Sequence, residues 1–120
     1  TLGMKTYDVP FIIVEDGDDL IVSFPLDEYA TESLTLLRTP KYDSLLPEDE
    51  WGVSVELGDA EGFAKQLLVT VEWGVSAVKL ATSARSYSLN VEAVSTEEII
   101  EAQRVLQKMN FDRCFELKNA

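Results

Sequence analysis

Residues 11–24 read FIIVEDGDDLIVSF, two β-rich runs on either side of an Asp/Gly cluster. Gly and Asp tolerate the left-handed backbone dihedrals that a tight turn needs, so the pattern predicts a β-hairpin. Pro25 follows directly and has no amide hydrogen for a strand ladder, so we expect the second strand to end there. We therefore expect an antiparallel sheet in the N-terminal part of the chain.

Short strands separated by turn residues continue through most of the chain. Residues 52–57 (GVSVEL) show the clearest pattern, because apolar and polar side chains alternate with a period of two. The alternation slips between Ala77 and Val78, which predicts a β-bulge. Residues 40–50 contain two prolines and little periodicity, so we expect a loop. The strands are expected at residues 11–14, 20–24, 34–38, 52–57, 67–73, 75–80 and 86–91.

One helix is predicted near the C-terminus. Ser95 suits the N-cap, and Glu98 three residues later completes a capping box. Apolar residues then recur at helical spacing and form one stripe, which we expect to cover a face of the sheet. The stripe consists of Ile99, Ala102, Val105, Leu106 and Met109.

These elements predict a single α+β domain over residues 4–120, with residues 1–3 as a cloning remnant. We expect a meandering antiparallel sheet of about six or seven strands, with the C-terminal helix packed on one face. The tail, Phe111–Leu117, is expected either as a short last strand or as irregular packing. Trp73 is expected in the core.

The formal net charge of −12 is unevenly distributed. Residues 1–62 carry three basic and fifteen acidic side chains, whereas residues 63–120 carry seven of each. Each contact with a phosphate needs a positive group, so we expect neither nucleic acid nor a membrane as partner. A basic protein or a cation fits better. A second interpretation stays open, in which the acidity only keeps the protein in solution.

The residues available for catalysis are few. The chain contains no histidine and one cysteine, Cys114. Ser-His and Cys-His nucleophilic sites are therefore excluded within this chain, and zinc lacks ligands. The Asp/Glu cluster around Gly17 is expected as a solvated turn. We expect no enzyme activity, no cofactor and no metal, with an enzyme built on carboxylates as the minor alternative.

The expected compartment is the cytoplasm. A single thiol cannot form an internal disulfide, which agrees with a reducing compartment. The first residues carry no secretion signal, and no apolar run approaches the roughly 20 residues that cross a bilayer.

Carboxylates surround an aromatic residue in the segment 48–61. Such an arrangement is typical of acidic proteins that capture Lys/Arg-rich surfaces, because charges fix the register while an aromatic anchor supplies buried area. For Trp51 the sequence favours simple packing into the core, and the anchor role stays open beside it. The candidate partner-binding residues are Glu48, Asp49, Glu50, Trp51, Glu56, Asp59 and Glu61.

Three stretches, in this order, resemble a known family. They are Asp18–Phe24 (DDLIVSF), Ser33–Arg38 (SLTLLR) and Trp51–Leu57 (WGVSVEL), the last followed by Gly58 and Asp59. With the later strands and a terminal helix rich in Leu and Ile, the layout is similar to the tenth family of bacterial immunity proteins from polymorphic toxin systems. The resemblance implies a protein that binds and neutralises a cognate toxin by covering a basic cleft, such as that of a nuclease.

The sequence thus predicts a non-enzymatic acidic binding protein, best specified as an immunity or inhibitor protein that neutralises a basic toxin by occlusion. We expect a monomer or a weak homodimer. The alternative is a homo-oligomeric structural or assembly module that associates through exposed strand edges.

Overall fold

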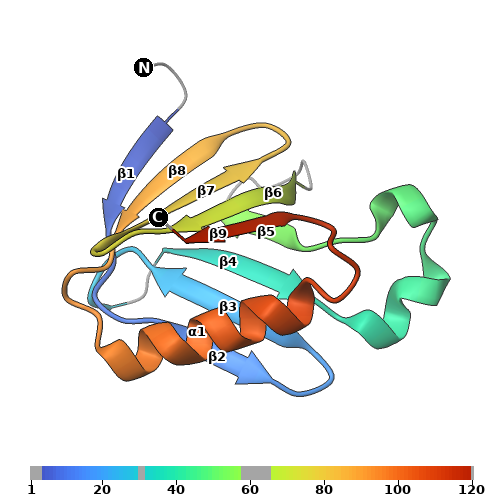
Figure 1. The fold of residues 1–120 in the computed structure, drawn as a ribbon, viewed down its shortest axis with the longest axis horizontal. Coiled ribbons are helices and arrows are strands. Elements are labelled where there is room, and N and C mark those ends of the chain that lie inside the picture. Colours follow the sequence, from blue (N-terminus) through green and yellow to red (C-terminus); the bar gives the residue numbers. More distant parts are fainter. Residues whose placement is uncertain (1–3, 30–31, 58–65, 120) are drawn as a thin grey trace.

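A computed structural model describes residues 4–29, 32–57 and 66–119 of the chain (Figure 1). Within these residues, a mixed sheet of nine strands carries one α-helix, α1 (Thr96–Met109), on one face. Two short 3-10 helices, η1 (Pro40–Leu45) and η2 (Glu48–Glu50), lie between β4 and β5. The strands are β1 (Met4–Asp8), β2 (Ile13–Asp16), β3 (Leu20–Pro25), β4 (Ser33–Arg38), β5 (Ser54–Leu57), β6 (Gln66–Trp73), β7 (Ala77–Thr82), β8 (Ser86–Asn90) and β9 (Glu116–Asn119).

The predicted antiparallel meander is present as β2 to β8, in which each strand pairs with the next. The expectation of six or seven antiparallel strands was nevertheless wrong, because both ends of the chain add a parallel strand. β1 pairs with β8, and β9 pairs with β6. β1 has the sequence MKTYD, which lacks the alternation that marks the other strands. The hairpin prediction is confirmed, with β2 beginning two residues later than expected and β3 ending at Pro25.

β6 joins the two parts of the sheet. Its first residues, Gln66 and Leu67, pair with β5, while residues 70–73 pair with β9. β5 and β9 therefore pair with successive parts of β6. The predicted bulge between Ala77 and Val78 was wrong, because β7 keeps a regular alternation. The register shift lies instead in β6, between Leu68 and Thr70. The alternation of apolar and polar residues is interrupted near Ala77 because β7 begins there, after the turn that follows Gly74.

The helix lies across β2 and β3, as Figure 1 shows. It buries four residues of the predicted apolar stripe, while the fifth, Ile99, is partly buried against the core. The Ser95 hydroxyl accepts a hydrogen bond from the Glu98 amide, as an N-cap should. The Glu98 carboxylate does not return to Ser95 within the described residues. It accepts a hydrogen bond of 2.8 Å from the amide of Ile12 and so ties the first turn of α1 to the start of β2.

The core lies between the helix and the sheet, and it includes Trp73 as expected. Leu34 and Leu36 on β4 and Leu106 on α1 are all completely buried. Alternate residues of β3 and β4 point into this core, which is why their sequences alternate.

Leu106→Ala should lower the free energy of unfolding by about 3 kcal/mol, because it removes a fully buried side chain from a packed interior. The matched control is Leu45→Ala, since Leu45 is 76% exposed and its truncation leaves the core intact. Urea unfolding followed by circular dichroism measures both. Equal losses from the two variants would contradict the assigned core.

Candidate functional site

Residues 40–51 form a projecting segment, called the arm below, at the end of the sheet where β4 stops (Figure 1). It contains both 3-10 helices, neither of which has a buried residue. The expected loop is therefore ordered into two short turns of helix. Pro40 at the start suits this conformation, because its fixed φ is compatible with a helical first turn.

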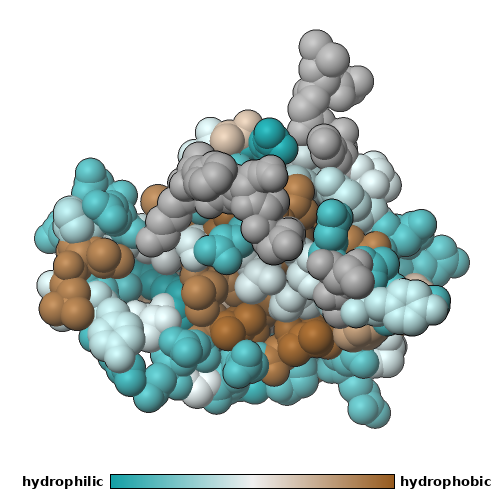
Figure 2. Space-filling model, turned by 180° about the vertical axis from the view of Figure 1, so that it is seen from behind, coloured by the Kyte–Doolittle hydropathy of each residue, from teal (hydrophilic) through white to brown (hydrophobic). Residues whose placement is uncertain are grey.

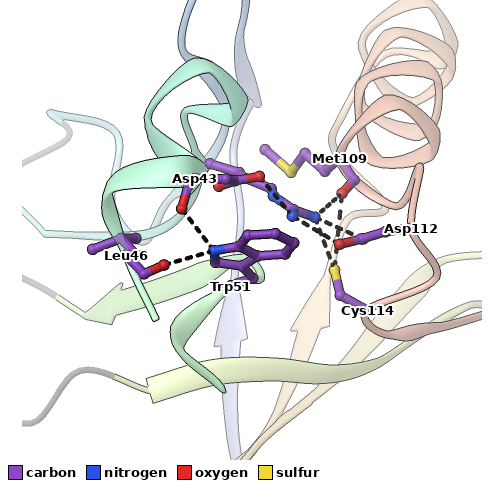
Figure 3. A network of polar contacts seen from close by, with 7 residues as sticks. Asp43, Leu46, Trp51, Met109, Asp112 and Cys114 are labelled. Carbon is purple, nitrogen blue, oxygen red and sulfur yellow. Dashed lines mark hydrogen bonds and ion pairs between the residues drawn. The ribbon is translucent and has the colours of Figure 1, made fainter. Parts of the chain in front are cut away.

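Trp51 closes the arm on itself. Its indole Nε1 donates hydrogen bonds to the carbonyls of Asp43 (2.7 Å) and Leu46 (3.1 Å), as Figure 3 shows. The side chain remains 37% exposed, so the interpretation that favoured simple core packing was wrong. The indole instead satisfies two backbone carbonyls of a segment that has no sheet partners.

Arg38, the last residue of β4, holds the arm to the body of the protein. It is 2% exposed, and its two terminal nitrogens bind both oxygens of Asp112 at 2.8 and 2.9 Å. Nη2 also donates to Asp43 of the arm at 2.9 Å. A bidentate pair of this kind combines strength with fixed geometry, and here it joins β4, the arm and the segment that follows α1.

The same guanidinium reaches the end of the helix. Nη1 donates to the carbonyl of Met109 at 3.0 Å and contacts the sulfur of Cys114 at 3.3 Å. The ring of Phe111 lies 4.3 Å from the guanidinium carbon. A positive charge at a helix C-terminus is favourable, because the last carbonyls carry partial negative charge.

These contacts determine the protonation states of the cluster. Hydrogen bonds from Arg38 lower the pKa of Asp112 to about 2, from an ordinary 3.8. Burial, together with the charge of Asp112, raises the pKa of Cys114 to about 11. The thiol therefore stays protonated at neutral pH, which makes it a weak nucleophile. Within the described residues, no group of three or more His, Cys, Asp or Glu side chains is placed to hold a metal ion.

Three of the predicted partner-binding residues, Glu48, Asp49 and Glu50, lie exposed on η2 of the arm, next to Trp51. None of the three carboxylates makes an ion pair within the described part of the chain. Glu56 is exposed on β5 opposite Thr35 and is separate from the arm. The remaining two, Asp59 and Glu61, lie outside the described residues.

The arm also exposes large apolar side chains that the sequence did not single out. Tyr42 is 51% exposed, Leu45 76% and Leu46 37%. Figure 2 shows hydrophobic side chains on the arm, at its left, surrounded by hydrophilic ones. Apolar anchors within a polar rim are the usual composition of a protein contact surface.

Sequence reasoning also missed the residues that position the arm, Arg38, Asp43 and Asp112. The sequence pattern could have indicated Arg38, because Leu34, Leu36 and Arg38 alternate along β4 and so occupy one face of it. A charged residue in line with two core leucines needs a partner. Nothing in the sequence indicates that this partner lies 74 residues away.

Comparison with known proteins finds no matching family model, no matching curated protein and no matching solved structure. The fold is therefore described as a mixed-sheet α+β domain, and the resemblance to immunity proteins stays a prediction. No helix in the described ranges has the length and apolar character needed to cross a membrane.

Asp112→Asn should reduce the dependence of stability on pH between about pH 4 and pH 2. The pKa of Asp112 is lowered on folding, so its ion pair stabilises the protein above the unfolded pKa, and this stability is lost as the pH falls through about 2. Thermal unfolding of both proteins across this range measures the effect. An identical slope in the variant would show that the Arg38–Asp112 pair carries no pH-dependent stability.

Trp51→Phe should loosen the arm without unfolding the domain, because it keeps the ring and removes the donor for two carbonyls. Cleavage after Glu48 and Glu50 by a Glu-specific protease should become several-fold faster, since local opening exposes the backbone. Circular dichroism should remain that of the unmodified protein. Unchanged cleavage would mean that the indole hydrogen bonds do not hold the arm.

Proposed function

We propose that this chain is a non-enzymatic binding protein, an immunity or inhibitor protein that neutralises a basic partner such as a toxin by occlusion. The arm is the contact surface. The observation that carries this proposal is a combination on one projecting segment. Three carboxylates that make no ion pair within the described residues lie beside exposed tyrosine, leucine and tryptophan side chains.

The charge state of the arm supports a basic partner. Several acids on the body of the protein are already engaged by bases of the same chain. Asp16 binds Arg104 and Lys108, and Asp18 binds Lys41. The carboxylates of η2 have no such partner within the described residues, so their field is directed toward solvent and any approaching positive surface.

The rigidity of the arm supports specific binding. Arg38 fixes its first half through Asp43, and Trp51 fixes its second half through two carbonyls. A segment that is already ordered loses less conformational entropy when a partner binds. Electrostatic steering would accelerate the encounter, and salt would slow it.

The alternative, a homo-oligomeric assembly module, would use the sheet edges. β1 and β2 end the strand order within the described residues. β2 is four residues long and carries Glu15 and Asp16, and charges of this kind oppose edge pairing. β1, and β9, which pairs only with β6 within the described residues, are thus the edges that this alternative would use. Sedimentation at increasing protein concentration tests it.

Reversing the charge of Glu48, Asp49 and Glu50 to lysine should abolish capture of a basic protein by the tagged chain from a lysate of its source cells at low salt. The three residues are exposed and make no ion pair in the part of the chain that the structure describes, so unfolding curves should change little. The matched control reverses Glu15, Glu28 and Glu92, which are exposed elsewhere and change the net charge equally.

The bound protein, identified by mass spectrometry, should be basic and should elute from the native chain and the control at moderate salt. If the control loses capture as fully as the arm variant, total charge and not the arm determines binding. If all three proteins capture nothing basic, the proposed function is wrong.

A further inference from the structure

A pocket of about 210 Å³ opens between the arm, the end of β4 and the start of β5. Leu37 of β4 and Tyr42 and Leu46 of the arm contribute large apolar side chains to its lining. Asp43 and Glu50 contribute carboxylates. The pocket therefore combines apolar and acidic side chains, in the part of the molecule that Arg38 and Trp51 hold in place.

The charges around the pocket are unbalanced. Arg38 supplies one positive charge, and its hydrogen bonds go to Asp112, to Oδ2 of Asp43, to the Met109 carbonyl and to the sulfur of Cys114. Lys41, over the ring of Tyr42, is paired with Asp18. Asp43, Glu50 and Asp112 supply three negative charges. Within the described residues, Oδ1 of Asp43 receives no hydrogen bond, and the Glu50 carboxylate receives none either. Two acceptors are thus available beside apolar side chains.

We propose that this pocket receives an arginine side chain of the basic partner, a role that rests on the proposed function of the arm. The aliphatic part of the side chain would lie along Leu37 and Leu46. The guanidinium would donate to Glu50 and to Oδ1 of Asp43, which makes a charge-assisted pair.

Other occupants fit this chemistry less well. An anion would meet two carboxylates, and the positive charge of Arg38 is already neutralised. An apolar side chain would cover Asp43 and Glu50 without giving them a donor, which is costly for a charged group. A lysine provides a point charge in place of a planar fork, so it matches two separated acceptors less closely.

The test uses three blocked tripeptides as probes, acetyl-Gly-Xaa-Gly-amide with arginine, lysine or citrulline at the centre. Citrulline keeps the shape of arginine and removes its charge. Titration into ¹⁵N-labelled protein, followed by amide chemical shifts, should place the arginine peptide at Thr39, Tyr42 and Gly52. Its affinity should exceed that of the citrulline peptide about tenfold, because charge-assisted hydrogen bonds are lost.

Glu50→Gln should weaken the arginine peptide about fivefold, since this exposed carboxylate lines the pocket. Glu92→Gln is the control, because Glu92 is exposed in the turn between β8 and α1, outside the arm, and does not line the pocket. Its effect should stay within about twofold, as expected for a charge that acts only from a distance.

Equal binding of the arginine and citrulline peptides, shifts outside the pocket, or equal losses from the two glutamine variants would each overturn the proposal. Self-association that Glu50→Gln abolishes would also overturn it, in favour of a second copy as the occupant. If none of the peptides binds, the pocket proposal is wrong, but the capture of a basic protein by the arm is unaffected. If the arginine peptide binds and no basic protein is captured, the proposed function of the arm is wrong and the pocket proposal stands.

Discussion

The guanidinium of Arg38 is the constraint on which the rest of the arrangement depends. Burial of a positive charge is costly unless it is paired and hydrogen-bonded, and three segments of the chain supply partners for Arg38 at the end of β4. Asp112 lies in the segment after α1 and Asp43 lies in the arm, while the Met109 carbonyl belongs to the last turn of the helix. This convergence determines where the arm leaves the sheet and where the chain turns toward β9.

Part of the excess negative charge in the first half of the sequence lies on the arm, where η2 carries Glu48, Asp49 and Glu50. Some acids on the body of the protein make internal contacts, such as Asp16 with two bases of α1 and Glu98 with the amide of Ile12. The carboxylates of η2 make no ion pair within the described residues, and the three are adjacent in sequence. On the arm, these carboxylates lie in the same short segment as the exposed side chains of Tyr42 and Leu45.

Much of the sheet could be predicted, because its strands carry their own pattern. The hairpin of β2 and β3 follows from an Asp/Gly turn between β-rich runs, and α1 follows from an N-cap and an apolar stripe. β1 could not be predicted in the same way, since its short sequence shows no alternation and its place beside β8 depends on a partner 82 residues later. The bulge was placed one strand too late, because the irregularity near Ala77 belongs to a turn.

The sequence by itself determined the α+β class, the antiparallel meander, the helix and the local run of acids on the arm, because each depends on neighbours within a few residues. Only the tertiary structure decided that Trp51 stays half exposed and holds the arm, that Glu98 binds Ile12, and that Arg38 joins Asp43 to Asp112. These contacts connect residues up to 86 positions apart. A polar group reveals that it needs a partner, but the chain's path through space selects which partner reaches it.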